Sequence, residues 1–411
     1  MIYGLIGEKL GHSFSREIHG ALSSDPYELR ELSSDALAPF LRERGFKGVN
    51  VTIPYKQAVM PHLDHLAESA VRSGAVNTIV NRGGELYGHN TDFDGFCLLA
   101  RHAGVDFAGA RTVILGRGGA AKAVRAAAIS MGAVSVRNAV RNPGSEDELP
   151  LSDPGSWGGC DIVVNATPVG MYPDWQGRIL DLDALEGLRG VLDCVYNPLR
   201  TRLVLDAAAK GIPAEGGLYM LVGQAIRARE LFTGEPLPDG VTEREYQRLL
   251  RSKQNIVLCG MPSCGKTTVG KALAGSCGRR FVDTDEVIVL QAGMDIPEIF
   301  AREGEAGFRA RETAAIESLA AEQGLVIATG GGSVLKDENI RLLRHNGLLC
   351  FLERNPMLLE PGSGRPLSGS REALMSLYER RLPRYRQVAD ITISNDGAPG
   401  QAVEELEKYV A

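Results

Sequence analysis

The sequence lacks the features that would place it in a membrane or on a nucleic acid. No apolar run approaches 18 residues, so we expect no membrane-spanning helix. The first residues, MIYGLIGEKLGHSFS, do not combine a basic segment with a long apolar core, so we expect no signal peptide. The formal net charge of −6 argues against a surface for polyanions, which leaves small molecules as the expected partners.

The seven cysteines lack any C-x-x-C pair, and their number is odd. This pattern favours free thiols in a reducing compartment over disulfides or a zinc site, so we expect a cytoplasmic protein. The remaining composition, with 44% hydrophobic and 23% charged residues, is ordinary for a soluble globular protein.

Short β-rich runs alternate with alanine-rich helical stretches, which predicts an α/β protein with parallel sheets. The expected strands lie at 48–54, 111–116, 160–168, 190–196, 255–260 and 324–330. The length of 411 residues predicts two or three domains. A Pro/Gly turn and a charged helix at 236–253 resemble a linker, and a second boundary is expected near residue 100.

A glycine-rich turn follows the expected strand at 111–116. The segment RTVILGRGGAAKAV places Gly116, Gly118 and Gly119 between a strand and a helix, as in dinucleotide-binding loops. An NAD site would carry an acid about 20 residues further on, but SVRNAVRNP holds Arg137, Asn138 and Arg141 instead. Positive groups there favour NADP(H); the alternative is that these arginines are simply solvated.

Small polar residues are dense in the first 92 residues, many of them at the carboxyl ends of expected strands. Ligands of α/β sheets bind at those ends. Hydroxyl and amide groups together suit a polyhydroxylated acid, although each residue alone could be a turn former. The set consists of Ser13, Ser15, Asn50, Thr52, Lys56, Asn77, Thr78 and Asn90 to Asp92.

The first half of the chain contains, in order, the motifs GHSFS, NVTIPYK, GAVNT, NTDFDGF, GRGGAA, NATPVGM, VYNPLRT and GLYMLVGQA. Through these motifs, residues 1–235 resemble shikimate dehydrogenase. The resemblance implies reduction of 3-dehydroshikimate to shikimate with NADPH. It also implies an α/β substrate domain at 1–100 with returning helices at 218–235, and a Rossmann NADP-binding domain at 101–217.

The resemblance also assigns roles by position. Lys56 and Asp92 would form the catalytic pair, since the alkoxide left by ketone reduction must gain a proton. Substrate would be bound by Ser13, Ser15, Asn50, Thr52, Asn77, Tyr196 and Gln224. NADP would be bound by Gly116, Arg117, Gly118, Gly119, Ala120, Asn138, Arg141, Thr167 and Met171.

The first half departs from the family pattern in three places. Arg117 replaces a small residue inside the glycine loop. Arg16 stands where the family usually has proline. The usual Asn-Arg-Thr of the phosphate clamp is replaced by Asn138-Ala139-Val140, so the clamp is expected on Arg141 or Arg117.

The second half opens with a phosphate-binding loop. NIVLCGMPSCGKTTVGKAL predicts a strand, the pattern from Gly260 to Gly265-Lys266-Thr267, and a helix. Backbone N–H groups of such a loop hold phosphates, the lysine reaches the β and γ oxygens, and the threonine hydroxyl binds Mg²⁺. FVDTDEVI adds Asp283 and Asp285, one to face the metal and one to face an acceptor alcohol.

Arginine-rich segments follow, and arginine suits bidentate binding of a small carboxylate. With GMPSCGKTT, DTD, FR-x-x-E, GGG, GRPL and R-x-P-x-Y, residues 254–411 resemble shikimate kinase, a P-loop fold with a parallel sheet flanked by helices. The resemblance implies that Asp285 accepts the hydroxyl proton and Arg365 closes over the transferring phosphate. Shikimate would be bound by Arg309, Gly330, Gly331, Gly332 and Arg381. ATP would be bound by Gly260, Gly265, Lys266, Thr267 and Thr268. Mg²⁺ would be bound by Thr267 and Asp283.

The segment before Arg365 is several residues shorter than the family pattern, and it lacks the arginine that usually packs on adenine. The leading hypothesis is nevertheless a bifunctional enzyme whose first half makes shikimate and whose second half phosphorylates it. One alternative makes the first half a quinate or shikimate dehydrogenase that works oxidatively with NAD. Another is a non-catalytic regulator that senses quinate-type ligands. The sequence leaves the oligomeric state open.

Overall fold

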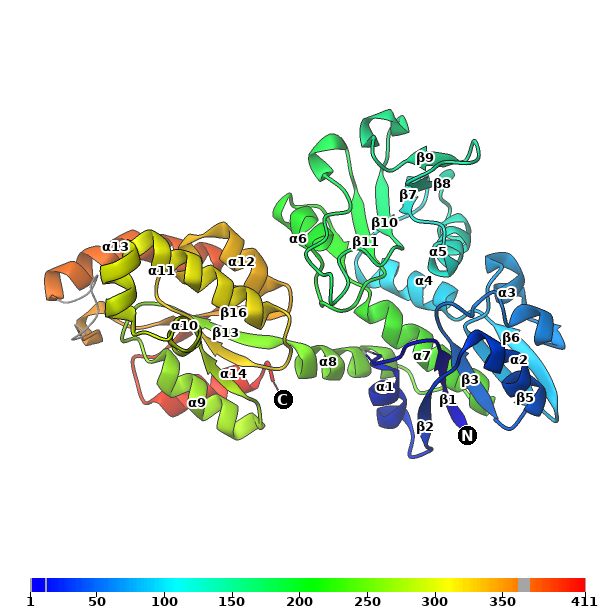
Figure 1. Ribbon diagram of the computed structural model, residues 1–411, viewed down its shortest axis with the longest axis horizontal. Helices are drawn as coiled ribbons and strands as arrows, with labels where there is room; N and C mark the ends of the chain where they lie inside the picture. The colour runs from blue at the N-terminus through cyan, green and yellow to red at the C-terminus, as the bar shows by residue number, and fades with distance from the viewer. Residues whose placement is uncertain (1, 12, 361–369, 411) are drawn as a thin grey trace. The chain divides into compact units, whose positions relative to one another are not determined.

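The computed structural model describes residues 2–11, 13–360 and 370–410. The chain divides into two compact units, Met1–Leu249 and Leu250–Ala411 (Figure 1). The first unit contains two six-stranded sheets, and the second contains one five-stranded sheet. Helices separate most consecutive strands, which confirms the predicted α/β class. The finer division into substrate domain, dinucleotide domain and linker remains a proposal.

The first sheet has the strand order β2-β1-β3-β5-β6-β4 and is mixed. Its strands are β1 (Tyr3–Gly7), β2 (Tyr27–Glu31), β3 (Gly48–Val51), β4 (His65–Leu66), β5 (Thr78–Arg82) and β6 (Glu85–His89). β5 pairs antiparallel with both β3 and β6. This sheet therefore departs from the parallel pattern that the alternation of strands and helices indicated. Gly83 and Gly84, both at positive φ, form the two-residue hairpin turn that favours antiparallel pairing.

The second sheet is parallel throughout, with the order β12-β11-β10-β7-β8-β9. Its strands are β7 (Arg111–Leu115), β8 (Ser135–Val140), β9 (Glu148–Pro150), β10 (Ile162–Asn165), β11 (Gly190–Asp193) and β12 (Ala214–Glu215). Numbered within the sheet, this is the 3-2-1-4-5-6 order of dinucleotide-binding folds, in which β7 is the first strand.

Helices of the first unit cover both sheets. They are α1 (Ser15–Leu22), α2 (Ser34–Glu43), α3 (Glu68–Ser73), α4 (Asp92–His102), α5 (Gly119–Ser130), α6 (Arg202–Ala209), α7 (Leu218–Thr233) and α8 (Val241–Lys253). α4 and α7 pack on each other, and both contribute to the core under the second sheet through Phe96, Leu99 and Met220. Further along α7, Ala228 and Phe232 pack against the first sheet.

The helix α8 lies in the segment expected as a linker, but one of its faces is packed. Tyr246 contacts the rings of His102 and Tyr219 at centroid distances of 5.0 and 4.9 Å. Arg248 pairs with Glu245 at 2.9 Å and with Glu17 of α1 at 3.5 Å. The first turns of α8 therefore belong to the first unit, which ends at Leu249.

The second unit is built on a parallel sheet with the order β14-β15-β13-β16-β17. Its strands are β13 (Asn255–Cys259), β14 (Phe281–Asp283), β15 (Val326–Ala328), β16 (Gly347–Glu353) and β17 (Ile391–Ser394). Its helices are α9 (Lys266–Cys277), α10 (Thr284–Ala292), α11 (Ile296–Ala320, broken at Gly304), α12 (Asp337–Arg344), α13 (Arg371–Val388) and α14 (Pro399–Glu407).

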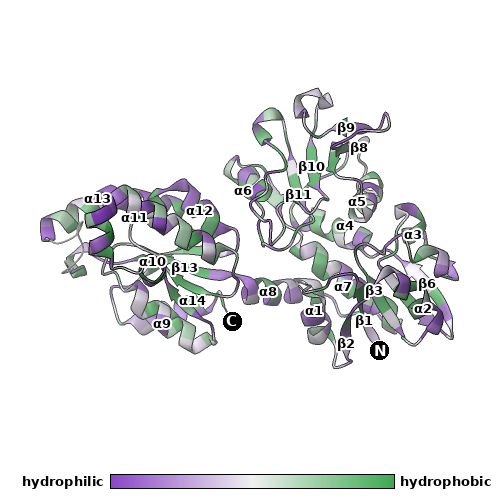
Figure 2. Cartoon of the chain, in the orientation of Figure 1, coloured by the Kyte–Doolittle hydropathy of each residue, from purple (hydrophilic) through white to green (hydrophobic). Residues whose placement is uncertain are grey.

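Figure 2 shows β10, β11 and β13 in the hydrophobic colour, as expected for strands covered on both faces. Each residue of these three strands is buried. Among the described residues, no helix is both long and apolar enough to cross a membrane.

Candidate active sites

Lys56 and Asp92 form a short ion pair in the first unit. Lys56 Nζ lies 2.5 Å from Asp92 Oδ2, and the two side chains are only 17% and 10% exposed. Asp92 is the first residue of α4, and its backbone N–H donates to Asn90 Oδ1. A partly buried ammonium held by a carboxylate is suited to give a proton to a developing alkoxide.

The amide of Asn77 is oriented by three donors. Its Oδ1 accepts hydrogen bonds from the Thr91 N–H at 2.7 Å, the Thr91 hydroxyl at 3.2 Å and the Thr78 hydroxyl at 3.0 Å. Among the described residues, no hydrogen bond donated by Asn77 Nδ2 is found. Gln224 Oε1, at 3.4 Å, is an alternative acceptor for the single proton of the Thr91 hydroxyl, so Thr91 lies between the two predicted substrate residues.

Asn50 belongs to the same polar network, but its hydrogen bonds go to the protein. It is 5% exposed. Tyr27 donates to its Oδ1 at 2.8 Å, while its Nδ2 donates to Thr78 Oγ1 at 3.0 Å and to Asn77 O at 3.3 Å. The described hydrogen bonds of the Asn50 amide thus all go to residues in and around the Asn77–Thr78 segment and Tyr27. Tyr27 was missed from the sequence, because nothing in the strand YELRE marks its hydroxyl.

The remaining predicted substrate residues are also near this region. The hydroxyls of Ser13 and Ser15 bond each other at 3.0 Å at the start of α1. The ring of Tyr196 lies 5.2 Å from the ring of Phe14, and Phe14 stands between the two serines in the sequence. Burial raises the pKa of the Tyr196 phenol, so it stays a neutral hydrogen-bonding group. Thr52 directly follows β3 and is half-buried.

Asp193 fixes the loop that carries Tyr196, and sequence reasoning missed it. It ends β11 and accepts hydrogen bonds from Asn165 Nδ2, the Val195 N–H and the Thr201 hydroxyl at 2.7 to 2.9 Å. Burial raises its pKa to about 7, although these hydrogen bonds oppose the rise. The available signal in GVLDCVY was an aspartate that directly follows a short apolar run.

The glycine loop at the end of β7 lies beside Lys56. A Cβ added at Gly119 would meet Lys56 Cδ at 3.3 Å, and one at Gly116 would meet Thr167 Cγ2 at 2.8 Å. Gly118 has no neighbour within 4 Å of its Cβ position, so the mouth of the loop at the start of α5 is open. These residues and Ala120 therefore meet at one helix N-terminus, which suits a pyrophosphate.

β8, the second strand of this dinucleotide-binding fold, ends at Val140. Asn138 lies inside β8, where its Nδ2 donates to Gly116 O at 2.7 Å and its Oδ1 accepts from Arg125 at 2.9 Å. Arg141 is the first residue after the strand and is exposed. Arg117 is exposed too, but it pairs with Glu148 at 3.2 Å. Of the two arginines expected to replace the clamp, Arg141 has the strand-end position.

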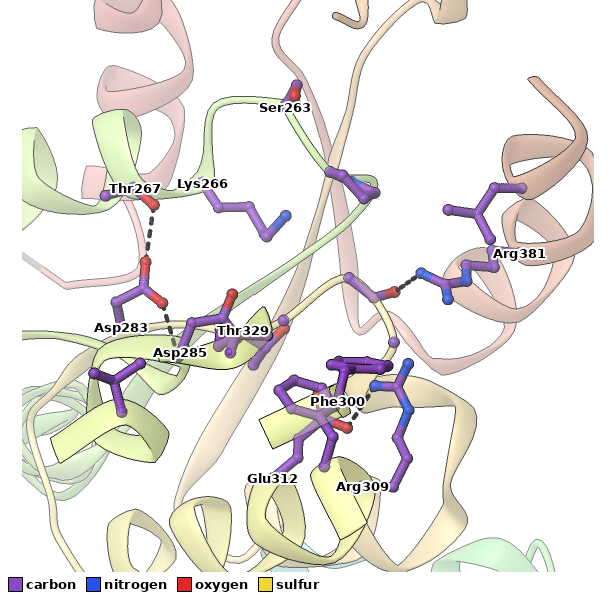
Figure 3. Close-up of a pocket in the computed structure, with 18 of the residues that line it drawn as sticks. Ser263, Lys266, Thr267, Asp283, Asp285, Phe300, Arg309, Glu312, Thr329 and Arg381 are labelled. Carbon is purple, nitrogen blue, oxygen red and sulfur yellow. Dashed lines mark hydrogen bonds and ion pairs between the residues drawn. The ribbon is translucent and has the colours of Figure 1, made fainter. Parts of the chain in front are cut away.

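The phosphate-loop residues surround a cavity of about 660 Å³ in the second unit (Figure 3). Lys266 Nζ donates to Gly260 O at 3.0 Å and to Met261 O at 2.9 Å, within the loop itself. The Thr267 hydroxyl donates to Asp283 Oδ2 at 2.9 Å, and Asp283 Oδ1 accepts from the Asp285 N–H at 3.0 Å. Gly265 and Thr268 also line the cavity.

The opposite wall of the cavity carries two arginines. Arg309 pairs with Glu312 at 2.8 Å, and Arg381 donates to Gly331 O at 2.9 Å. Burial alone would lower the pKa of Arg309, but the carboxylates of Glu312 and Glu305 raise it. A Cβ at Gly332 would lie 2.4 Å from the Arg309 guanidinium, so only glycine allows this approach.

Asp285 also faces this wall. A Cβ at Gly330 would lie 3.1 Å from Asp285 Oδ1 and 2.9 Å from Glu312 Oε1. The structure therefore brings the predicted Asp285, Arg309, Arg381 and glycine groups into one cavity. Glu312, only 1% exposed, was part of the quoted FR-x-x-E motif but was not predicted as a site residue.

Two predicted residues are not placed in these sites. Arg365 lies outside the described residues. Met171 is 40% exposed, and no described contact brings it to the glycine loop.

Comparison with known proteins assigns both units. One family model, described as shikimate dehydrogenase substrate binding domain, matches residues 5–79. Another, described as shikimate kinase, matches residues 262–411. A shikimate dehydrogenase (NADP(+)) of Clostridium beijerinckii is 36% identical over 259 residues, which cover 59% of this chain and 96% of that protein. The chain belongs to the shikimate dehydrogenase family.

Solved shikimate dehydrogenases agree with this assignment. That of Peptoclostridium difficile matches with a TM-score of 0.56 and 34% identity, covering 60% of this chain and 97% of that one. That of Thermus thermophilus, in complex with NADP(H) and shikimate, matches with a TM-score of 0.54 and 33% identity, covering 60% and 99%. The kinase domain follows the dehydrogenase in the sequence, so the chain is a dehydrogenase–kinase fusion, as the motifs predicted.

Proposed function

We propose that the chain catalyses two consecutive reactions. The first unit reduces 3-dehydroshikimate to shikimate with NADPH, and the second transfers the γ-phosphoryl group of ATP to the 3-hydroxyl of shikimate. The observation that carries this proposal is that the first unit holds the Lys56–Asp92 pair and the second unit holds the loop–aspartate–arginine cavity.

In the first reaction NADPH supplies a hydride to the ketone carbon when it is bound. The ketone oxygen then needs a proton, and Lys56 Nζ is the donor that the buried ion pair provides. Asp92 holds the ammonium in place. The amide of Asn77 donates to a ring hydroxyl, and the hydroxyls of Ser13 and Ser15 bind the carboxylate.

The residues at the glycine loop fit a dinucleotide phosphate. The open N-terminus of α5 offers N–H groups to the pyrophosphate, as expected for this loop. Arg141, exposed at the end of β8, is the group that we propose for the 2′-phosphate. Arg117 would reach the same phosphate only by leaving Glu148.

In the second reaction the loop from Gly260 to Thr268 holds the nucleotide phosphates. Lys266 leaves its loop carbonyls for the β and γ oxygens, and Thr267 with Asp283 binds Mg²⁺, which neutralises phosphate charge when present. Asp285 accepts the proton of the attacking hydroxyl. Arg309 and Arg381 bind the shikimate carboxylate, against the backbone of Gly331 and Gly332.

The two alternatives have less support. A sensing regulator does not need both catalytic lysines, and Lys56 and Lys266 are both in place. An NAD-dependent quinate dehydrogenase would favour an acid, not Arg141, after the second strand. All seven cysteines are free thiols, which supports the proposal of a cytoplasmic enzyme with small-molecule partners.

A single incubation tests the proposal. The full chain is supplied with 3-dehydroshikimate, NADPH, ATP and Mg²⁺, and mass spectrometry should show shikimate 3-phosphate. Lys56→Ala should stop NADPH oxidation and leave phosphorylation of added shikimate unchanged, while Lys266→Ala should do the reverse. Absence of the phosphate product from the unsubstituted chain, or loss of both activities in either variant, would contradict two independent sites.

A further inference from the structure

An arginine without a described partner follows the strand beside the phosphate loop. Arg354 comes directly after β16, which pairs in parallel with β13, the strand that leads into Gly260. The carboxyl ends of both strands therefore lie at the same edge of the sheet. Within the described ranges, Arg354 makes no hydrogen bond or ion pair, and its Nε is buried. A buried donor of this kind is costly unless a ligand satisfies it.

The guanidinium of Arg354 is close to the loop itself. A Cβ placed on Gly265 would lie 3.8 Å from Arg354 Nη1 and 2.5 Å from Asn395 Nδ2. Asn395 follows β17 and donates to Cys264 O at 2.8 Å, so it anchors the same loop. Its own Oδ1 is also buried without a partner among the described residues.

The backbone around Arg354 is held in place on both sides. The Asn395 N–H donates to Glu353 O at 2.8 Å, and the Asn355 N–H donates to Asp396 Oδ1 at 2.6 Å. The strand ends of β16 and β17 are thereby joined at the residue before Arg354 and at the residue after it. This frame holds the backbone on both sides of Arg354, and no carboxylate of the described residues pairs with its guanidinium.

Positive charge gathers at this point. Lys266 and the N-terminus of α9 lie at the same loop, and Arg354 adds a third positive group. Two carboxylates next to this frame have other partners, since Glu353 pairs with Arg386 and Asp396 accepts from the Asn355 N–H. Such a cluster of positive groups is suited to bind an anion that contacts several of them at once.

We infer that Arg354 contacts a phosphate group of the bound nucleotide and is a further substrate-binding residue of the kinase. This inference rests on the proposed kinase function. It explains why the cation has no carboxylate beside it, because an ion pair there would compete with the nucleotide.

The test measures Mg-ADP binding to the full chain by calorimetry. Arg354→Ala and Arg354→Gln should both raise the Kd by roughly ten- to hundredfold, the scale of a charge-assisted hydrogen bond. Arg354→Lys should keep most of the affinity, since it retains the charge. The loss in Arg354→Ala should shrink as KCl is raised. Arg280→Ala is the matched control and should bind like the unsubstituted chain, because that exposed arginine already pairs with Glu322.

Dehydrogenase turnover in the same samples, together with an unchanged Km for shikimate, shows that both units are folded. If Arg354→Ala and Arg354→Gln bind Mg-ADP as tightly as the unsubstituted chain, the inference is wrong and the kinase function stands. If Arg354→Lys loses as much as Arg354→Ala, a planar stacking contact replaces the phosphate contact, which also overturns it. If the unsubstituted chain does not bind Mg-ADP, the proposed kinase function itself fails.

Discussion

The close contact between α4 and α7 leads to a prediction about Gly95→Ala. A Cβ at Gly95 would lie 2.5 Å from Met220 O and 3.1 Å from the backbone N of Gln224. The obstacle is the backbone of α7, so it cannot be relieved by a rotamer change. The two helices must separate by a few tenths of an ångström or more. Since Asp92 starts α4 and Gln224 lies on α7, the separation moves two predicted site residues apart.

The size of the effect follows from two opposing contributions. Overpacking of a close contact costs about 1–3 kcal/mol. Alanine is favoured over glycine in a helix by about 0.5–1 kcal/mol, which offsets part of that cost. The net destabilisation is about 0–2.5 kcal/mol, or a fall in the melting temperature of the first unit of up to about 10 °C. A shift approaching 1 Å at the reacting groups can lower kcat/KM by about a hundredfold.

Gly20→Ala is the matched control, because Gly20 lies in the helix α1 and nothing lies within 4 Å of its Cβ position. It should stabilise the first unit by about 0.5–1 kcal/mol and leave both activities unchanged. Differential scanning calorimetry and NADPH oxidation are measured for each variant, with kinase turnover as an internal reference. If Gly95→Ala is as stable and as active as Gly20→Ala, the approach of α4 to α7 does not position the site.

Two further predictions concern the cofactor and the pH. Arg141→Ala should weaken NADPH binding by about ten- to hundredfold and leave NADH binding nearly unchanged, as followed by nucleotide fluorescence; equal losses for both would exclude Arg141 as the clamp. Burial lowers the pKa of His19 to about 3, and the positive charge of Arg229 adds to this shift. Between pH 3 and about 6.5 the unfolded chain therefore binds more protons than the folded chain, so stability rises with pH. The first unit should lose about 2 kcal/mol from this histidine between pH 7 and pH 5, and chemical denaturation of His19→Phe should lack that part of the slope.

The sequence predicted the strands well because each buried strand is a short apolar run. Its errors lie at the ends of the expected runs, which extend beyond the strands, most often at the carboxyl end. The run expected at 160–168 is a strand only over Ile162–Asn165. The Asn165 side chain then bonds the Thr167 N–H and Asp193, which turns the backbone into a loop. Polar residues that follow an apolar run therefore mark the end of a strand.

The part of the site that could not be predicted depends on contacts between distant segments. Tyr27 and Asn50 are 23 residues apart, and only the pairing of β1 with both β2 and β3 brings their strands together. The position of Arg141 depended on the register of β8, which pairs Asn138 with Ile114 inside the sheet. The sequence offered Arg141 and Arg117 as candidates for the clamp, and the register of β8 gives Arg141 the strand-end position.

The carboxyl edge of each parallel sheet offers a rule that works without motifs. Asp285 was found by motif, whereas we propose Arg141 and Arg354 because each is the first residue after a parallel strand, at the edge of the sheet where the ligand loops begin. The amino edge provides the contrast. Arg111 starts β7 and pairs with Asp161 at 3.0 Å, and this pairing lowers the pKa of Asp161 to about 2. A satisfied ion pair at that edge has no charge left for a ligand, so its contribution is to stability, whereas an unpaired cation at the carboxyl edge is available for binding.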